Sequence, residues 1–193
     1  MAPRPGNPRP RLGRKQWEIA ALEMIGERGV AGLAVEPLAR RIGVTKGSFY
    51  WHFDNLEALM EAALARWERV FTDLKYGALE KISDPAERLR PLFGDLAAEE
   101  PAIQVFLALL EAREHPAVRP VLRRATQKRL RFLAETLGDL GMSPKRAQDR
   151  ARLLFSAYAG FQQLATLNLE GLRSRRERKA FLERLFQRLV REG

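Results

Sequence analysis

The turn at Gly43 constrains the fold of this chain more than any other feature. Before it, residues 37–42 form a short apolar-patterned segment, Pro-Leu-Ala-Arg-Arg-Ile. Glycine suits this point, because it adopts the positive φ that often closes a helix. Thr45 then offers a side-chain oxygen as the N-cap of a second helix that runs to Phe53. Two short helices around a glycine-containing turn predict a helix-turn-helix, a motif whose second helix enters the DNA major groove.

The second helix is unusual for a helix of a protein core. Phe49 and Phe53 lie four residues apart, so they share one face and are expected to anchor the helix. The other positions carry hydrogen-bond donors and aromatic rings on most faces: Lys46, Ser48, Tyr50, Trp51 and His52. Two interpretations of Trp51 stay open, namely contact with a sugar or thymine methyl group of DNA, and coverage of the core.

Motifs on both sides of the turn extend the pattern. They are Ala20-Ala21-Leu22 with Glu27-Arg28-Gly29, then Leu38-Ala39, Gly43-Val44, Thr45-Lys46-Gly47-Ser48, Tyr50-Trp51-His52-Phe53 and Glu57-Ala58-Leu59. In this order and spacing, residues 11–71 resemble the TetR family of transcriptional regulators. Two departures are visible. Ala34, Val35 and Glu36 stand where the family usually caps the second helix with Thr, and Leu56 stands where it commonly has a phosphate-binding Lys.

The resemblance implies an all-α fold in three parts. Residues 1–10 would be a basic flexible arm, and 11–71 a three-helix DNA-binding domain with its helix-turn-helix at 34–53. Residues 72–193 would be a helical ligand-binding and dimerisation domain. The implied function is a ligand-responsive regulator, in the first place a repressor. It would bind a palindromic double-stranded operator as a homodimer and be released by a small apolar or amphipathic effector. The alternative is a constitutive DNA-binding or architectural protein whose C-terminal half only dimerises.

Helix faces, apolar surface and this resemblance together predict three sets of site residues. The expected DNA-binding residues are Arg11, Arg14, Arg40, Thr45, Lys46, Gly47, Ser48, Tyr50, Trp51 and His52. The expected effector site comprises Trp67, Phe71, Phe106, Leu110, Tyr158 and Gln162. The expected dimer interface comprises Phe155, Ala157, Gly160, Phe161, Leu164, Leu182, Leu185, Phe186 and Leu189. Plainer alternatives remain for the last two sets: the apolar segment 103–110 as a fully buried core helix, and the C-terminal helices as packing within one chain.

The rest of the chain shows helical periodicity. Apolar residues predict a helix over 14–27 and, after an N-cap at Asp54, a five-turn apolar stripe from Leu56 to Leu74. Proline and glycine divide the C-terminal part of the chain into helices over about 85–96, 101–116, 120–137 and 175–191. Another is expected to run from Ser143-Pro144, as N-cap and first position, to Leu169.

Composition narrows the function further. Residues 1–53 carry nine Lys and Arg against four Glu, in a chain of net charge +10, which favours a polyanionic partner. The proline-rich basic start is either a solvated tail or an arm that tracks the minor groove or the phosphates. With no Cys and two His, we expect no metal site, no cofactor and no catalytic centre, and the absence of Cys suits a cytoplasmic protein. No apolar run is long enough to predict a membrane span.

Overall fold

The computed structural model describes residues 13–95, 101–167, 171 and 174–191, and there every regular element is helical. The N-terminal part contains α1 (Arg14–Arg28), a 3₁₀ turn (Val30–Gly32), α2 (Val35–Arg41), α3 (Lys46–Tyr50) and α4 (Leu56–Glu68). A π-helical turn (Arg69–Leu74) joins α4 to α5 (Lys75–Leu79). The remaining elements are α6 (Pro85–Asp95), α7 (Pro101–Glu111), α8 (Val118–Asp139), α9 (Pro144–Thr166), α10 (Arg175–Phe186) and a second π-helical turn (Gln187–Arg191).

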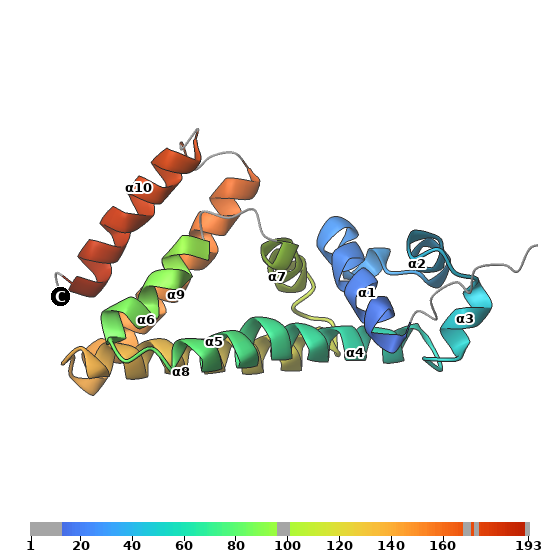
Figure 1. Ribbon diagram of the computed structural model, residues 1–193, viewed down its shortest axis with the longest axis horizontal. Helices are drawn as coiled ribbons and strands as arrows, with labels where there is room; N and C mark the ends of the chain where they lie inside the picture. The colour runs from blue at the N-terminus through green and yellow to red at the C-terminus, as the bar shows by residue number, and fades with distance from the viewer. Residues whose placement is uncertain (1–12, 96–100, 168–170, 172–173, 192–193) are drawn as a thin grey trace, which may run out of the picture.

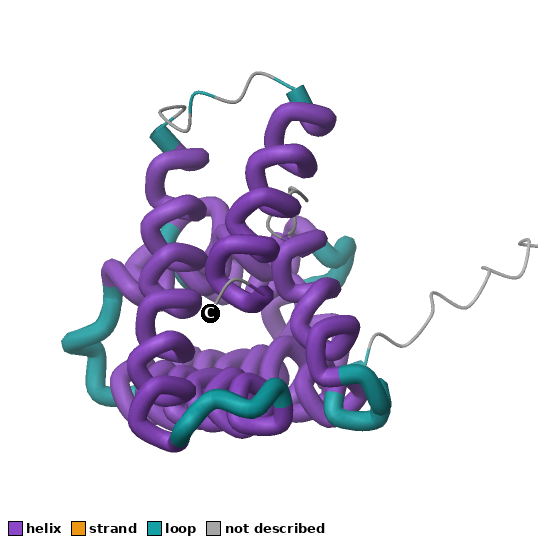
Figure 2. Tube along the Cα trace, turned by 90° about the vertical axis from the view of Figure 1, so that its left-hand side faces the viewer, coloured by secondary structure: helices purple, strands orange, loops and turns teal. Residues whose placement is uncertain are grey.

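A long helical rod, formed by α4, the π-helical turn and α5, runs along the molecule. In Figure 1, α4, the π-helical turn and α5 run across the molecule beside α8, with α1, α2 and α3 at one end. At the other end α9 and α10 rise side by side, as Figure 2 also shows. The helix-turn-helix therefore forms a head at one end of a helical body.

The head and the body share a hydrophobic core. Trp17 and Ile25 of α1 are fully buried, in the same cluster as Leu64 of α4 and Leu109 of α7. Helix α1 packs against both α4 and α7, so the head contacts the body through two helices. The apolar stripe predicted for the first helix is confirmed by this packing.

The predicted helix starts are partly wrong. Thr45 occupies the N-cap position of α3, and its backbone carbonyl accepts from Ser48 N at 3.0 Å, but its side chain makes no capping hydrogen bond. Helix α4 is capped by Asn55 rather than Asp54, since the Asn55 side chain accepts from Ala58 N at 2.8 Å. Ser143 precedes α9 without a side-chain cap, although Pro144 is its first residue as predicted.

The continuous α-helical stripe from Leu56 to Leu74 is also wrong. A π-helical turn bonds i to i+5 and so accommodates more residues per turn than an α-helix, which changes the face that each later residue presents. Thr72 is therefore buried and Leu74 is 57% exposed. Two helix ends differ as well, because α7 stops at Glu111 rather than near Pro116, and α9 stops at Thr166.

Candidate DNA-binding face and internal cavity

Helix α3 and the turn that follows it are held by two buried rings, Phe49 and Phe53. Phe49 is fully buried and meets Trp17 of α1 edge-on, with ring centroids 5.4 Å apart. It also stacks on Phe53, at a centroid distance of 5.7 Å. The predicted anchor pair is therefore confirmed, and the other side chains of the helix are left to point outward.

The outward face of α3 is both aromatic and polar. Trp51 is 87% exposed and Tyr50 is 58% exposed, which excludes the interpretation that Trp51 covers the core. Thr45, Lys46 and Gly47 are exposed beside them. Ser48 and His52 are half-buried, and Arg40 of α2 is exposed. The structure thus leaves most of the expected DNA-binding residues accessible at one end of the molecule.

Lys46 has an acidic neighbour on α2. Its ammonium donates a hydrogen bond to Glu36 Oε1 at 2.9 Å, and both side chains are exposed. This hydrogen bond raises the pKa of Lys46 and lowers the pKa of Glu36. A phosphate that binds Lys46 must therefore compete with Glu36.

Arg14 ties α1 to the end of α3. Its guanidinium lies 4.4 Å from the centre of the Phe53 ring and donates to the carbonyl of His52 at 3.2 Å. It also pairs with Glu18 at 3.5 Å. These contacts favour a positioning role for Arg14. Arg11 and the basic arm 1–10 lie outside the described residues.

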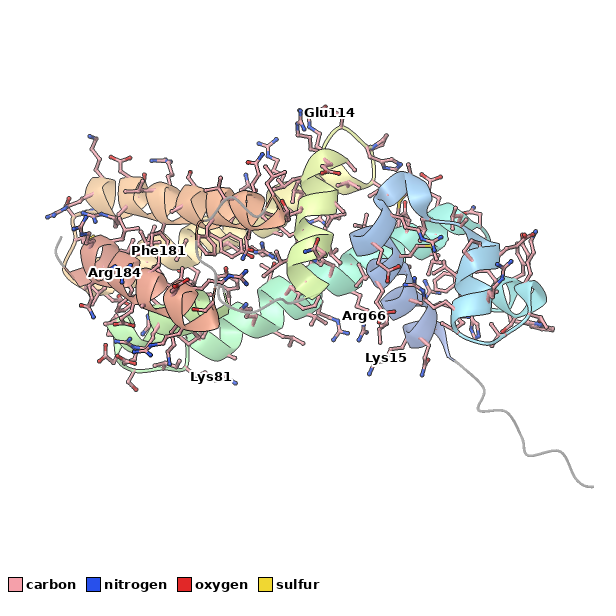
Figure 3. All side chains as sticks on the ribbon, turned by 90° about the horizontal axis from the view of Figure 1, so that it is seen from above. Lys15, Arg66, Lys81, Glu114, Phe181 and Arg184 are labelled. Carbon is pink, nitrogen blue, oxygen red and sulfur yellow. The ribbon has the colours of Figure 1, made fainter. Side chains whose placement is uncertain are left out.

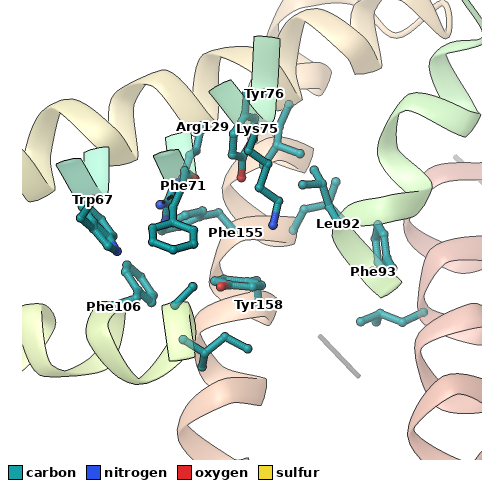
Figure 4. A pocket seen from close by; sticks show the side chains of 15 residues that line it. Trp67, Phe71, Lys75, Tyr76, Leu92, Phe93, Phe106, Arg129, Phe155 and Tyr158 are labelled. Carbon is teal, nitrogen blue, oxygen red and sulfur yellow. Dashed lines mark hydrogen bonds between the residues drawn. The ribbon is translucent and has the colours of Figure 1, made fainter. Parts of the chain in front are cut away.

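A cavity lies in the helical body, where the long rod meets four other helices and α10. It encloses about 860 Å³ of space, including its opening to solvent. Figure 4 shows how side chains from the different helices converge on it. Its lining comprises Trp67, Phe71, Lys75, Tyr76, Leu92, Phe93, Ala102, Ile103, Phe106, Arg129, Leu133, Leu154, Phe155, Tyr158 and Leu185.

The structure brings four of the six expected effector residues to this cavity: Trp67, Phe71, Phe106 and Tyr158. Leu110 does not line it, but packs half-buried against the shared core. Gln162 lies outside the lining too and is buried, with its amide nitrogen unpartnered among the described residues. Both interpretations of segment 103–110 hold in part, because one side of α7 faces the cavity and the other packs against α1.

Arg129 was not predicted, although the sequence contains a signal for it. The buried residues of α8 recur at helical spacing through Val118, Leu122, Ala125 and Phe132, and Arg129 falls on the same face. An arginine on an apolar stripe must find polar partners inside the protein. Arg129 is 6% exposed and donates to Thr72 Oγ1 at 3.1 Å through Nη2 and at 3.3 Å through Nε.

The predicted dimer residues divide into two groups. Phe161, Leu182 and Phe186 are buried within the single chain, and Phe155, Leu185 and Leu189 are half-buried there. For these six, packing within the chain is what the structure shows, because α10 packs on α6 and supplies Leu182 to a cluster with Phe161 of α9.

A different face of α9 remains uncovered. Leu164, from the predicted set, is 45% exposed, and Leu153 and Leu167 are 51% and 59% exposed. Ala157 and Gly160 lie between them at intervals of three and four residues, so the five positions form one stripe along the helix. No residue of the described chain would contact a side-chain carbon at Gly160 within 4 Å.

The described residues contain no group of three or more His, Cys, Asp and Glu that could hold a metal ion. Among the helices that the structure describes, none combines the length and hydropathy needed to cross a membrane.

Fold and site together define an all-helical protein with a helix-turn-helix head and a cavity-containing body. Residues 20–63 match the family model described as bacterial regulatory proteins, tetR family. Tetracycline repressor protein class D of Escherichia coli is 40% identical over 52 residues, which cover 27% of this chain and 24% of the repressor. The chain thus spans about a quarter of the length of the curated relatives it matches.

Solved structures match over nearly the whole length. A TetR-family member from Streptomyces coelicolor is 26% identical and covers 92% of this chain and 98% of its own, with a TM-score of 0.64. A putative transcriptional regulator from Saccharomonospora viridis, in complex with choline, is 20% identical and covers 90% of this chain and 95% of its own, with a TM-score of 0.76. Residues 20–63 therefore form a helix-turn-helix domain of the TetR type, and the chain as a whole shares the fold of TetR-family structures.

Proposed function

We propose that the protein is a ligand-responsive transcriptional regulator, and specifically a repressor, that binds a palindromic operator as a homodimer. The observation that carries this proposal is the outward face of α3, where Tyr50 and Trp51 are exposed beside a fully buried Phe49. Two large aromatic side chains that are exposed next to each other are more typical of an interaction surface than single scattered apolar residues are. The family match over residues 20–63, which lies within the expected domain 11–71, supports DNA as the partner of this surface. Such a regulator acts in the cytoplasm.

The exposed face suggests a role for each side chain. Lys46 and Ser48, near the start of α3, are placed to reach base edges or phosphates, and Tyr50 and His52 to reach phosphates. The indole of Trp51 suits a sugar or thymine methyl group because it offers apolar surface. Arg40, Thr45 and Gly47 lie at the rim of this face, and Arg14 holds α1 against it.

A salt titration tests the DNA-binding face. Lys46→Ala and Tyr50→Phe should weaken binding to a selected operator without unfolding the protein. Loss of a contact between Lys46 and a phosphate should reduce the magnitude of the slope of log K against log salt by about 0.9, whereas Tyr50→Phe removes no charge and should leave the slope unchanged. Lys81→Ala is the matched control, because Lys81 is an exposed lysine near the opposite end of the molecule (Figure 3). Unchanged affinity in both α3 variants would count against this placement.

The same titration tests the N-terminal arm. Removing residues 2–13 deletes Arg4, Arg9 and Arg11 and should flatten the slope while leaving the melting temperature nearly unchanged. An identical slope after truncation means that the arm makes no phosphate contact.

The uncovered face of α9 supports a two-fold dimer. Leu153, Leu164 and Leu167 present apolar surface, while Ala157 and Gly160 allow a second helix to approach closely. A helix-turn-helix that binds two half-sites needs a symmetric partner, which this stripe can provide by packing on its own copy.

Two helices connect the cavity to the head. Trp67 of α4 and Phe71 of the π-helical turn both line the cavity, and α4 leads back from them towards α3. Phe106 is on α7, which packs against α1 so closely that a side-chain carbon at Gly26 would lie 3.3 Å from Cβ of Gln104. A ligand that displaces α4 or α7 would therefore tilt the head. A dimer must hold its two α3 helices about 34–36 Å apart, one turn of DNA, so a tilt releases the operator.

Constitutive DNA binding is the second candidate function, and the cavity with its buried arginine favours the ligand-responsive one. A small-molecule extract of the cell, fractionated and added to the protein–operator complex, separates the two. Coupling of the usual size would weaken operator binding about 5–150-fold in at least one fraction. No change in any fraction would favour the constitutive protein.

A further inference from the structure

Arg129 is a buried cation with no anionic partner among the described residues. It lines the cavity and bonds only to neutral groups, Thr72 Oγ1 and the carbonyl of Phe71 at 3.3 Å. Glu68, one helical turn before Thr72, pairs instead with Arg124 and Lys128. Buried charges in proteins are normally paired, because desolvation of an isolated charge costs several kcal/mol or more.

The aromatic walls of the cavity already hold this cation. The Arg129 guanidinium lies 5.0 Å from the Trp67 ring centre and 5.5 Å from the Phe106 ring centre. The two rings are nearly parallel, with an interplanar angle of 5°. Cation–π attraction compensates part of the desolvation cost. The same contact places a positive charge beside the ring faces that could bind an ammonium ligand. A cationic ligand is therefore disfavoured at these rings.

Within the described part of the chain, Trp67 has a buried hydrogen-bond donor without a partner, beside the unpaired charge of Arg129. Its side chain is 1% exposed, it lines the cavity, and its Nε1 has no hydrogen-bond partner among the described residues. Figure 4 shows the Trp67 nitrogen and the Arg129 guanidinium in the same corner of the cavity, beside Phe71 and Phe106. Among the described residues Arg129 donates through Nε and Nη2 only, so its Nη1 is available to a ligand. A buried donor left unpaired is unfavourable, so this corner lacks an acceptor.

We propose that the cavity binds an organic carboxylate with a flat or extended apolar body. The carboxylate would accept from Arg129 Nη1 and Trp67 Nε1, and the bond from the guanidinium would be a charge-assisted one. The body would lie against Phe71, Phe155 and Tyr158, all in the cavity lining. Lys75 adds a second positive charge to that lining. This inference rests on the proposed function, because it names the chemical class of the effector.

Matched ligand pairs test the charge requirement. Calorimetry on the full chain would compare phenylacetate, naphthalene-2-carboxylate and dodecanoate with their carboxamides, and with naphthylmethyl-trimethylammonium as a cation. We expect at least one carboxylate to bind about 10- to 100-fold more tightly than its carboxamide, the usual gain from charged hydrogen bonds. The ammonium compound should not bind.

Variants assign the preference to Arg129. Arg129→Gln should equalise the carboxylate and its carboxamide, while Arg129→Lys should retain part of the preference because it keeps the charge. Trp67→Phe should weaken carboxylate binding several-fold. Arg131→Gln is the control, since Arg131 is an exposed arginine on the same helix. Circular dichroism reports whether each variant stays folded. If Arg129→Gln unfolds, the ligand comparison is made with folded Arg129→Lys.

The outcomes separate this inference from the proposed function. No binding by any carboxylate, equal binding by the carboxamides, or a preference unchanged in folded Arg129 variants would overturn the inference and leave DNA binding intact. A strong preference that depends on Arg129, but no change in operator affinity, would support the inference and refute regulation by the ligand.

Discussion

Two aromatic residues at α3 should respond in opposite ways to the same substitution. Phe49 is fully buried, and Phe→Ala changes at such sites cost about 3–5 kcal/mol in the free energy of unfolding. Trp51, two residues later, is 87% exposed, so Trp51→Ala should change that free energy by about 0.5 kcal/mol or less. If DNA buries the Trp51 ring, its loss removes about 1.5–3 kcal/mol of binding, which is about 10- to 100-fold in operator affinity.

Urea unfolding monitored by circular dichroism, together with operator binding, measures both quantities. Phe49→Ala should lose about 3–5 of the roughly 5–15 kcal/mol by which a typical domain is stable, and should weaken operator binding because α3 loses its buried anchor. Trp51→Ala should unfold at the same urea concentration as the wild type, but should bind DNA weakly. Destabilisation of Trp51→Ala by more than about 1 kcal/mol, or operator affinity equal to wild type, would refute the placement of this face.

Three further substitutions test other parts of the molecule. Glu36→Gln frees Lys46 from its 2.9 Å hydrogen bond and removes a negative charge from the DNA face, so operator binding should tighten several-fold; weaker binding would contradict this. Burial alone would raise the pKa of Glu68, but hydrogen bonds from Arg124 and a neighbouring lysine outweigh burial and hold that pKa below its ordinary value of 4.5. Glu68 thus contributes stability above about pH 4.5 that is lost as the pH falls through its folded-state pKa. Glu68→Gln should lower the free energy of unfolding by about 1–2 kcal/mol at neutral pH, a value reduced because the partners of Glu68 are partly exposed. The difference in this free energy from wild type should shrink in acid. A difference that stays constant with pH would count against the ion pair. Leu164→Glu should shift the dimer to monomer in analytical ultracentrifugation, and an unchanged sedimentation coefficient would exclude the α9 stripe as the interface.

The helix-turn-helix could be predicted from sequence because its signals are local. Gly43 does adopt a positive φ of 72°, and the spacing of Phe49 and Phe53 fixed which face of α3 is buried. Cap positions were predicted less well, since Thr and Asp next to a helix start differ from a true cap only in side-chain orientation. For this reason the N-cap of α4 was predicted at Asp54, whereas it lies at Asn55.

The cavity could be predicted only in part, because it depends on how distant helices meet. Trp67 and Tyr158 were found from helical periodicity, but the π-helical turn that brings Thr72 inward has no periodic signal. Arg129 could have been predicted from the fact that it is a charged residue on the apolar stripe of α8. The C-terminal helices show the same difficulty, because apolar positions alone do not distinguish packing within the chain from packing against a second copy. Leu182 belongs to the first kind and Leu164 is exposed in the single chain.

Selection of bound duplexes from a random DNA library, with sequencing of the retained DNA, tests whether the protein binds a two-fold operator. We expect enrichment of an inverted repeat whose half-site centres lie about one helical turn, or a multiple of it, apart, about 10–10.5 base pairs per turn. Trp51→Ala should lose this enrichment, while Lys81→Ala should retain it. No enriched sequence, or a single half-site without its inverted copy, would contradict a two-fold operator-binding regulator.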